Sequence, residues 1–227
     1  MKIATWNVER PLKSSPKTVE IINILKSLNA DIIVLTETNE FIDLGEEYKV
    51  YHTAALQDPK YKKGERRVSI FSKYPQSITA PSFKTFNNET SICINFNTPL
   101  GELAVYGTII GILGLRKATY VTDLEKQLID IENICKKVDN FCFIGDLNMT
   151  FSDNIYSSDK SRNKLNDTFM KSGLNIYTEE IYYNIDHIVL SEKFVDIRNV
   201  KCSNWNDPEN KQTRLSDHKG VMIEIAE

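Results

Sequence analysis

Acidic, amide and histidine side chains recur at one kind of position in this chain, at or near an end of an apolar, strand-like run or in the loop that adjoins it. The members of this set are Asn7, Glu9, Glu37, Asp146, Asn148, Asp186, His187, Asp217 and His218. Strand ends converge on one rim of a sheet, where carboxylates repel one another unless a cation lies between them. The set therefore indicates a cation-binding site, although any single Asp or Asn after a strand can instead be a turn residue.

The hydrophobic periodicity predicts the elements that must hold these residues in place. Strands are expected at 2–8, 32–35, 48–54, 68–71, 91–96, 103–110, 141–144, 185–190, 197–203 and 221–225. Helices are expected at 116–138, at 160–172 and from Pro16 to Leu28, where Ser15 would be the N-cap, and a charged loop is expected at 57–67. About nine to twelve strands with about three helices fit two packed sheets with helices outside. No repeat or linker divides the chain, so one domain over residues 1–227 is expected.

Composition narrows the class of protein. The 227 residues are 41% hydrophobic and 26% charged, which is ordinary for a globular chain with a sizeable core. The net charge of -3 argues against tight non-specific DNA binding by the whole surface, but it leaves room for a local basic rim. The four cysteines show no Cys-x-x-Cys pairing, and Cys93 and Cys142 read as buried hydrophobes. The chain has neither a signal-peptide pattern nor an apolar run near the ~18 residues of a membrane span, so a cytoplasmic, reduced protein is predicted.

Six segments resemble motifs of the endonuclease/exonuclease/phosphatase family, and they occur in that family's order. They are Thr5-Trp6-Asn7-Val8-Glu9, Leu35-Thr36-Glu37, Arg67 to Pro75, Gly145-Asp146-Leu147-Asn148, Ile185-Asp186-His187-Ile188 and Ser216-Asp217-His218. The resemblance covers almost the whole chain. It implies a four-layer α/β sandwich, with two central, mainly antiparallel sheets flanked by helices, and a divalent-metal-dependent phosphoesterase.

The resemblance also implies a metal site. Glu37 matches the family's metal-binding glutamate and would bind a hard cation, Mg²⁺ or Mn²⁺. Glu9 and Asp217 would add to the same coordination shell, directly or through water.

Five further residues take catalytic roles by the same resemblance. Asn7 would orient the cluster, and Asp146 would position or deprotonate the attacking water. Asn148 would donate an amide N–H to a phosphate oxygen. His218 would contact the phosphate, while Asp186 would fix its tautomer and favour its charged form. His187, by contrast, is expected to pack or to line the rim.

One position departs from the family's pattern. Many members carry His or Asn after the strand that corresponds to Leu103–Ile109, and Ile109 stands at that place here. Isoleucine can donate neither a proton nor a hydrogen bond, so that contact is missing or supplied elsewhere. Tyr106 matches a strand tyrosine of abasic-site endonucleases and is a candidate phosphate contact. The alternative is that Tyr106 is a strand aromatic whose hydroxyl is satisfied within the fold.

Basic and aromatic loop residues are candidates for substrate binding. The best basic patch is Lys62-Lys63-Gly64-Glu65-Arg66-Arg67, in which Lys63 and Arg67 could hold backbone phosphates; otherwise the segment is a solvated loop. Arg214, beside the last motif, is a weaker candidate of the same kind. Trp205 could stack on a base, or it could be a packing residue at the rim.

Three functions remain open from the sequence. The first is a Mg²⁺- or Mn²⁺-dependent nuclease that acts, as a monomer, on DNA or RNA. The second is a phosphatase or phosphodiesterase for a small-molecule or lipid phosphoester, which the acidic net charge favours. The third is a phosphate-binding scaffold without catalysis, which only Ile109 supports.

Overall fold

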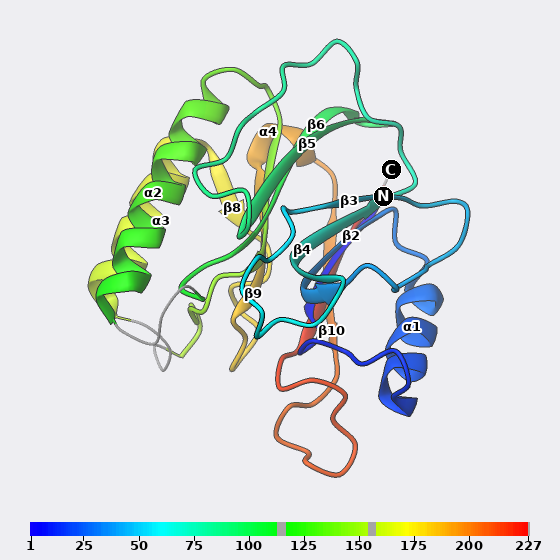
Figure 1. Ribbon diagram of the computed structural model, residues 1–227. Coiled ribbons are helices and arrows are strands. Elements are labelled where there is room, and N and C mark those ends of the chain that lie inside the picture. The colour runs from blue at the N-terminus through cyan, green and yellow to red at the C-terminus, as the bar shows by residue number, and fades with distance from the viewer. Residues whose placement is uncertain (113–116, 154–157, 227) are drawn as a thin grey trace.

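Two β-sheets pack face to face at the centre of the protein, and helices cover their outer faces (Figure 1). The computed structural model describes residues 1–112, 117–153 and 158–226. The layers run from helix α1 through a six-stranded sheet and a five-stranded sheet to helices α2 and α3. The predicted four-layer α/β sandwich is therefore confirmed.

The six-stranded sheet contains both ends of the described chain. Its strands, in spatial order, are β10 (Val200–Trp205), β11 (Gly220–Ile225), β1 (Lys2–Asn7), β2 (Ile32–Asn39), β4 (Glu65–Ser72) and β3 (Lys49–His52). Only the β1–β2 pair is parallel, because helix α1 (Pro16–Leu28) carries the chain back across the sheet between them.

The five-stranded sheet is built the same way. Its order is β5 (Ser91–Thr98), β6 (Gly101–Ile109), β7 (Phe141–Asp146), β9 (Asp186–Ser191) and β8 (Leu174–Ile176). Helix α2 (Lys117–Cys135) makes the crossover between the parallel strands β6 and β7, and the other pairs are antiparallel. Helices α3 (Asp159–Lys171) and α4 (Glu192–Val195) complete the fold.

Both faces of the central strands are buried, so alternate residues of such a strand enter different cores. On β6, Leu103 and Val105 point into the core between the sheets, whereas Ala104 and Tyr106 point into the core beneath α2 and α3. Trp6 on β1 likewise joins Ile21 and Leu25 of α1 in a third core. The sandwich is held by three apolar layers, which fixes the strand ends relative to one another.

The boundaries of several elements differ from the predicted ones. Ser15 precedes α1 in extended backbone as expected, but its side chain makes no capping hydrogen bond. The charged segment 57–67 is not all loop, because strand β4 begins at Glu65. The three-residue strand β8 was not predicted, since three residues carry too little periodicity to be recognised. Residue 116, predicted to begin a helix, lies outside the described residues, and α2 is helical from Lys117 to Cys135.

Two other expectations concern cysteines and membranes. All four cysteines are free, and Cys93 and Cys142 are buried, as predicted. Within the described ranges, no helix combines the length and the apolar character that crossing a membrane requires.

Candidate active site

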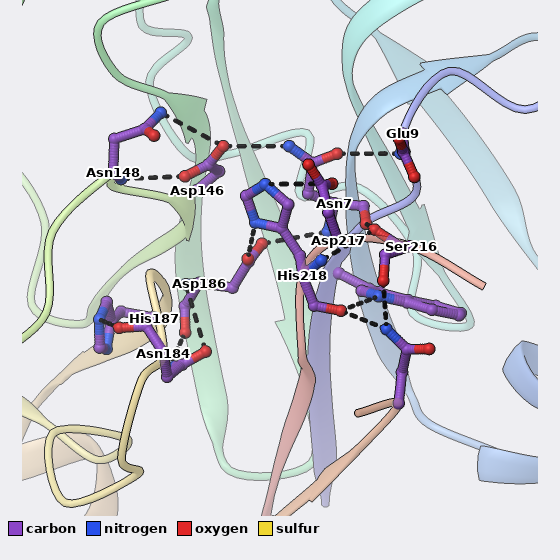
Figure 2. Close-up of polar contacts among 12 residues, drawn as sticks. Asn7, Glu9, Asp146, Asn148, Asn184, Asp186, His187, Ser216, Asp217 and His218 are labelled. Atoms are coloured by element: carbon purple, nitrogen blue, oxygen red, sulfur yellow. Dashed lines mark hydrogen bonds and ion pairs between the residues drawn. The ribbon is translucent and has the colours of Figure 1, made fainter. Parts of the chain in front are cut away.

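Four predicted residues meet at one end of the interface between the two sheets. Asn7 ends β1, Asp146 ends β7, Asp186 begins β9, and His218 lies in the loop that leads into β11 (Figure 2). The first three side chains are at most 2% exposed. Two of the elements belong to each sheet, so the packing of the sandwich itself brings the four residues together.

Asp186 links the two sheets. One of its carboxylate oxygens accepts the backbone N–H of Asn7 at 3.0 Å, and the other lies 2.6 Å from Nδ1 of His218. Because a carboxylate only accepts, Nδ1 of His218 carries a proton, while Nε2 lies 3.8 Å from Oδ1 of Asp217. Ser216 supports this geometry, since its hydroxyl donates to the carbonyl of Asn7 at 2.6 Å and accepts from the N–H of His218 at 3.1 Å.

Asp146 is enclosed by amide donors. It accepts the side-chain N–H of Asn7 at 3.0 Å and the backbone N–H of Asn148 at 2.9 Å. The residue before Asp146 has to be a glycine. The φ of Gly145 is +138°, and a Cβ there would lie 1.9 Å from the carbonyl oxygen of Thr108. The side chain of Asn148 donates to the carbonyl of Ile110 at 2.9 Å, and its Nδ2 also donates to Oδ2 of Asp146 over a longer 3.4 Å.

Burial and mutual charge shift the pKa values of this cluster. Burial raises the pKa of Asp146 to about 7, with opposition from the His218 charge and added repulsion from Asp186. Burial alone would lower the pKa of His218, but the carboxylates of Asp186, Asp146 and Asp217 outweigh it and raise that pKa to about 10. The cluster thus holds an imidazolium beside a carboxyl that titrates near neutral pH.

The same cluster is the group of side chains best placed to hold a metal. Ligand atoms of Asp146, Asp186 and His218 all lie within 4.8 Å of one another, and the described part of the chain contains no other such group of three. The two carboxylates can bind a divalent ion, whereas His218 could join them as a ligand only as a neutral imidazole, because an imidazolium has no free lone pair.

The three predicted metal ligands are placed around this cluster and do not form a group of their own. Glu37 is ion-paired with Arg10, at 2.7 Å between Oε2 and Nε. Glu9 is exposed, and its backbone N–H donates to the side-chain oxygen of Asn7. Asp217 is about half exposed and lies 3.8 Å from Nε2 of His218. Their role as ligands stays a prediction.

Tyr106 does not reach the site, so its assignment as a phosphate contact is wrong. Its side chain is fully buried on the α2 side of the five-stranded sheet, where it stacks on Phe143. Its hydroxyl donates to Asp130 of α2 at 2.7 Å. Ile109, which was expected to mark a missing polar contact, is buried in the core between the sheets and pairs in register with Asp146.

The predicted substrate-binding residues differ in how accessible they are. Lys63 is exposed and Arg214 is partly exposed, so both can contact a ligand. Arg67 is only 5% exposed and lies over the ring of Tyr61, 4.7 Å from its centroid. Trp205 packs edge-on against Trp6, with ring centroids 5.8 Å apart, and its indole nitrogen is buried without a partner. For Trp205 the structure favours the packing role over base stacking.

Two residues that the sequence reasoning missed support the site. The side chain of Asn206 donates to the carbonyls of Ser216 and His218 at 2.8 and 2.5 Å, and thereby fixes the loop that carries His218. Nothing in the local sequence of Asn206 signals this, because its partners lie ten and twelve residues away. Arg10 is the second of these residues and pairs with Glu37. Its place directly after the first motif, next to Glu9, is the only feature of the sequence that could have indicated its role.

His187, next to Asp186, points away from the site. It is fully buried, and its Nε2 lies 2.8 and 3.1 Å from the carbonyls of Met149 and Asn184, while its Nδ1 lies 3.0 Å from the hydroxyl of Thr178. The prediction that His187 packs is consistent with this position.

Known proteins resemble this chain over almost its whole length. The family model described as Endonuclease/Exonuclease/phosphatase family matches residues 4–218. The chain belongs to this family. Its members hydrolyse phosphoesters, so this family member is a phosphoester hydrolase of a typically divalent-metal-dependent kind. No curated protein sequence matches the chain.

Solved structures of the endonuclease/exonuclease/phosphatase type share the fold at low identity. The 3' phosphatase NExo from Neisseria, bound to product DNA hairpin, superposes with a TM-score of 0.70 at 14% identity, and the match covers 100% of each chain. The Xenopus laevis APE2 catalytic domain gives 0.70 at 16% identity, covering 99% of this chain and 91% of its own. An AP endonuclease from Archaeoglobus fulgidus gives 0.66 at 17% identity over 100% of both chains.

Proposed function

We propose that this family member is a Mg²⁺- or Mn²⁺-dependent nuclease that hydrolyses phosphodiesters of DNA or RNA. The observation that carries the proposal is the Asp146–Asn7–Asp186–His218 network at the end of the inter-sheet interface. It supplies what phosphodiester hydrolysis needs, namely a group to take a proton from water and positive charge for the phosphate. Several proteins that share the fold are named as DNA-processing enzymes, which supports nucleic acid as the substrate.

Asp146 is the proposed base. Its pKa of about 7 lies near the working pH, which favours proton transfer from an attacking water. The amides of Asn7 and Asn148 hold the carboxylate so that one orientation is populated before substrate arrives.

His218 is the proposed phosphate contact. Asp186 holds its Nδ1–H, so Nε2–H of the imidazolium can donate to a non-bridging phosphate oxygen. Asn148 would turn the amide N–H that faces Asp146 at 3.4 Å toward another phosphate oxygen. These two donors favour the transition state, in which charge accumulates on the phosphate oxygens.

The divalent ion would be held by Glu37 with Glu9 and Asp217, as the family motifs imply. The carboxylates of Asp146 and Asp186 offer alternative ligands. When bound, the ion supplies charge neutralisation at the phosphate and lowers the pKa of water. Lys63 and Arg214, both accessible at the surface, are the proposed contacts to the substrate backbone.

A phosphatase or phosphodiesterase for small phosphoesters is the second candidate. The observation that favours it is the net charge of -3 together with the burial of Arg67, which removes one cation from the proposed rim. A smaller substrate needs fewer backbone contacts than a polynucleotide.

Nicking of supercoiled plasmid tests the proposal. We expect nicking with Mg²⁺ or Mn²⁺, none with EDTA, and a loss of about a thousandfold in Asp146→Asn. Lys193→Gln is the matched control, since Lys193 pairs with the exposed Asp139 beyond the opposite end of β9. Metal-dependent hydrolysis of mononucleotides or inositol phosphates without nicking would instead establish the second candidate.

A further inference from the structure

Arg10 and Glu37 are joined twice. The guanidinium Nε of Arg10 lies 2.7 Å from Oε2 of Glu37, and the backbone N–H of Arg10 donates to the carbonyl of Glu37 at 2.7 Å. The two residues lie just past the paired residues Asn7 and Thr36, where β1 ends beside β2. Arg10 is therefore fixed at the edge of the site by its backbone, while its side chain makes a separate contact.

The backbone at this junction is held in an uncommon conformation. Glu9, Arg10 and Glu37 have φ values of 53°, 50° and 46°, in the left-handed region that favours glycine. Such a conformation is strained for residues other than glycine, and strained residues of this kind cluster at functional sites. This backbone conformation occurs in the loop just after β1 and, within β2, at the residue that follows the partner of Asn7, which indicates that the positions of Arg10 and Glu37 serve the site.

The two side chains differ in freedom. The Glu37 side chain is 14% exposed, whereas that of Arg10 is 52% exposed. The carboxylate is held inside the protein, and the guanidinium can leave it for solvent. A cation that binds Oε2 of Glu37 would lie beside the guanidinium, so the two positive charges would compete for the carboxylate.

The pair Arg66 and Glu40 on the same sheet shows the reverse arrangement. Arg66 is 17% exposed and also donates to the carbonyl of Thr53 at 2.9 Å, whereas Glu40 is 44% exposed. There the arginine is anchored and the carboxylate is free to move. Of these two pairs, only Arg10–Glu37 therefore combines a carboxylate held inside the protein with an exposed guanidinium.

We propose that Arg10 binds a substrate phosphate. Its ion pair with Glu37 occupies the guanidinium in the metal-free protein, and a divalent ion at Glu37 releases it. The inference rests on the proposed metal role of Glu37. A guanidinium presents paired N–H donors that match phosphate oxygens, so a released Arg10 near Asn7 has a ready partner in a substrate phosphate. Metal and phosphate then bind cooperatively, and the coupling acts equally in both directions.

The first test measures metal binding without turnover. Mn²⁺ alone is titrated into metal-free protein and the free ion is read by electron paramagnetic resonance. We expect Arg10→Gln to bind Mn²⁺ about two- to fivefold more tightly than the wild type, because no guanidinium competes for Glu37. Glu37→Gln should weaken binding, and Lys193→Gln, which removes one positive charge remote from the site, should match the wild type.

The second test measures the coupling. In an Asp146→Asn background, which prevents cleavage, a short DNA duplex should tighten Mn²⁺ binding about fivefold, and this gain should vanish with Arg10→Gln. Arg10→Lys keeps a charge but not the paired donors, so it should bind Mn²⁺ as the wild type does and still lose most of the coupling. If circular dichroism shows that Arg10→Gln does not fold, Arg10→Lys still tests the proposal.

Unchanged or weaker Mn²⁺ binding in Arg10→Gln, or unchanged binding in Glu37→Gln, would overturn the proposal. So would full coupling in Arg10→Lys. Because the Mn²⁺ titration involves no hydrolysis, an absence of plasmid nicking would refute the proposed nuclease without altering the outcome for Arg10.

Discussion

Two histidines lie on opposite sides of strand β9, and their pKa values are shifted in opposite directions. On the inner face, Asp186 contacts His218, whose pKa is raised to about 10. On the outer face, His187 has its pKa lowered to about 4, first by burial. Burial disfavours the imidazolium in both cases, so desolvation alone does not explain the difference.

The partners of each ring decide the outcome. His218 faces three carboxylates, whereas His187 faces two carbonyls and the hydroxyl of Thr178. Carbonyls only accept, so Nε2 of His187 carries the single proton and the threonine hydroxyl donates to Nδ1. The hydroxyl oxygen also accepts the N–H of Ile188 at 3.0 Å, which fixes this direction. The inner face of β9 therefore contacts a charged histidine that can take part in catalysis. On the outer face, a neutral histidine joins neighbouring segments by hydrogen bonds.

The largest test of this comparison is Asp186→Asn. An asparagine at this place can turn an N–H toward His218, so the imidazole loses its charge and its orientation. We expect kcat/KM for the cleaved phosphodiester to fall by roughly a thousandfold. Thr178→Val, on the other face of the strand, is the control, and it should keep the wild-type rate per folded molecule. Equal losses in the two variants would contradict the division between the faces.

The pH dependence of stability sharpens the comparison. The pKa of His187 is about 4 in the folded protein, below the usual 6.5. Between these two pH values the unfolded chain binds a proton at His187 and the folded protein does not. Its contribution is fully present above about pH 6.5 and is lost as the pH falls toward 4. The stability advantage of the wild type over His187→Asn should therefore shrink by on the order of 3 kcal/mol across that window.

His218 should give the opposite slope. Its folded pKa lies above 6.5, so its contribution is full below pH 6.5 and is lost as the pH rises toward 10. The advantage over His218→Gln should shrink with increasing pH. Urea unfolding across the pH range measures both differences, and the titration of Asp146 cancels from the His187 difference because both proteins contain it. Parallel slopes for the two histidines would show that burial alone governs both.

The convergence of the site could be predicted from the sequence because it depends on strand ends. Asn7, Asp146 and Asp186 each stand where an apolar strand begins or ends, and the sandwich packs those ends together. The face of a strand could not be predicted in the same way. Both faces of β6 are buried, so its sequence shows no alternation of polar and apolar residues to tell that Tyr106 points toward α2.

Contacts between distant loops also could not be predicted from the sequence. The hydrogen bonds of Asn206 to the His218 loop and the pairing of Arg10 with Glu37 join segments whose spacing carries no periodic signal. The burial of Arg67 under Tyr61 is of the same kind, since both belong to a stretch whose composition is that of a solvated loop. Local composition predicts exposure only where no other segment covers it.

A smaller effect is expected from Thr178→Val measured as stability. The substitution preserves shape but removes the hydroxyl that bridges Nδ1 of His187 and the N–H of Ile188, both of which are buried. Leaving two buried groups unpaired should lower the free energy of unfolding by about 2 kcal/mol. Urea unfolding at neutral pH measures it, and a change below a few tenths of a kcal/mol would mean that the link does not stabilise the outer face.

The smallest effect is expected from Tyr106→Phe. Tyr106 lies on the same outer face of the five-stranded sheet, and its hydroxyl bonds to Asp130, which keeps the N–H of Phe86 as a second donor at 2.7 Å. Loss of one hydrogen bond to a half-buried carboxylate should cost about 1 kcal/mol of stability. The rate should stay within about twofold of the wild type, because nothing on this face contacts the substrate. A fall of a hundredfold in kcat with unchanged stability would return Tyr106 to the active site, and would mean that the outer face of the sheet also serves the chemistry.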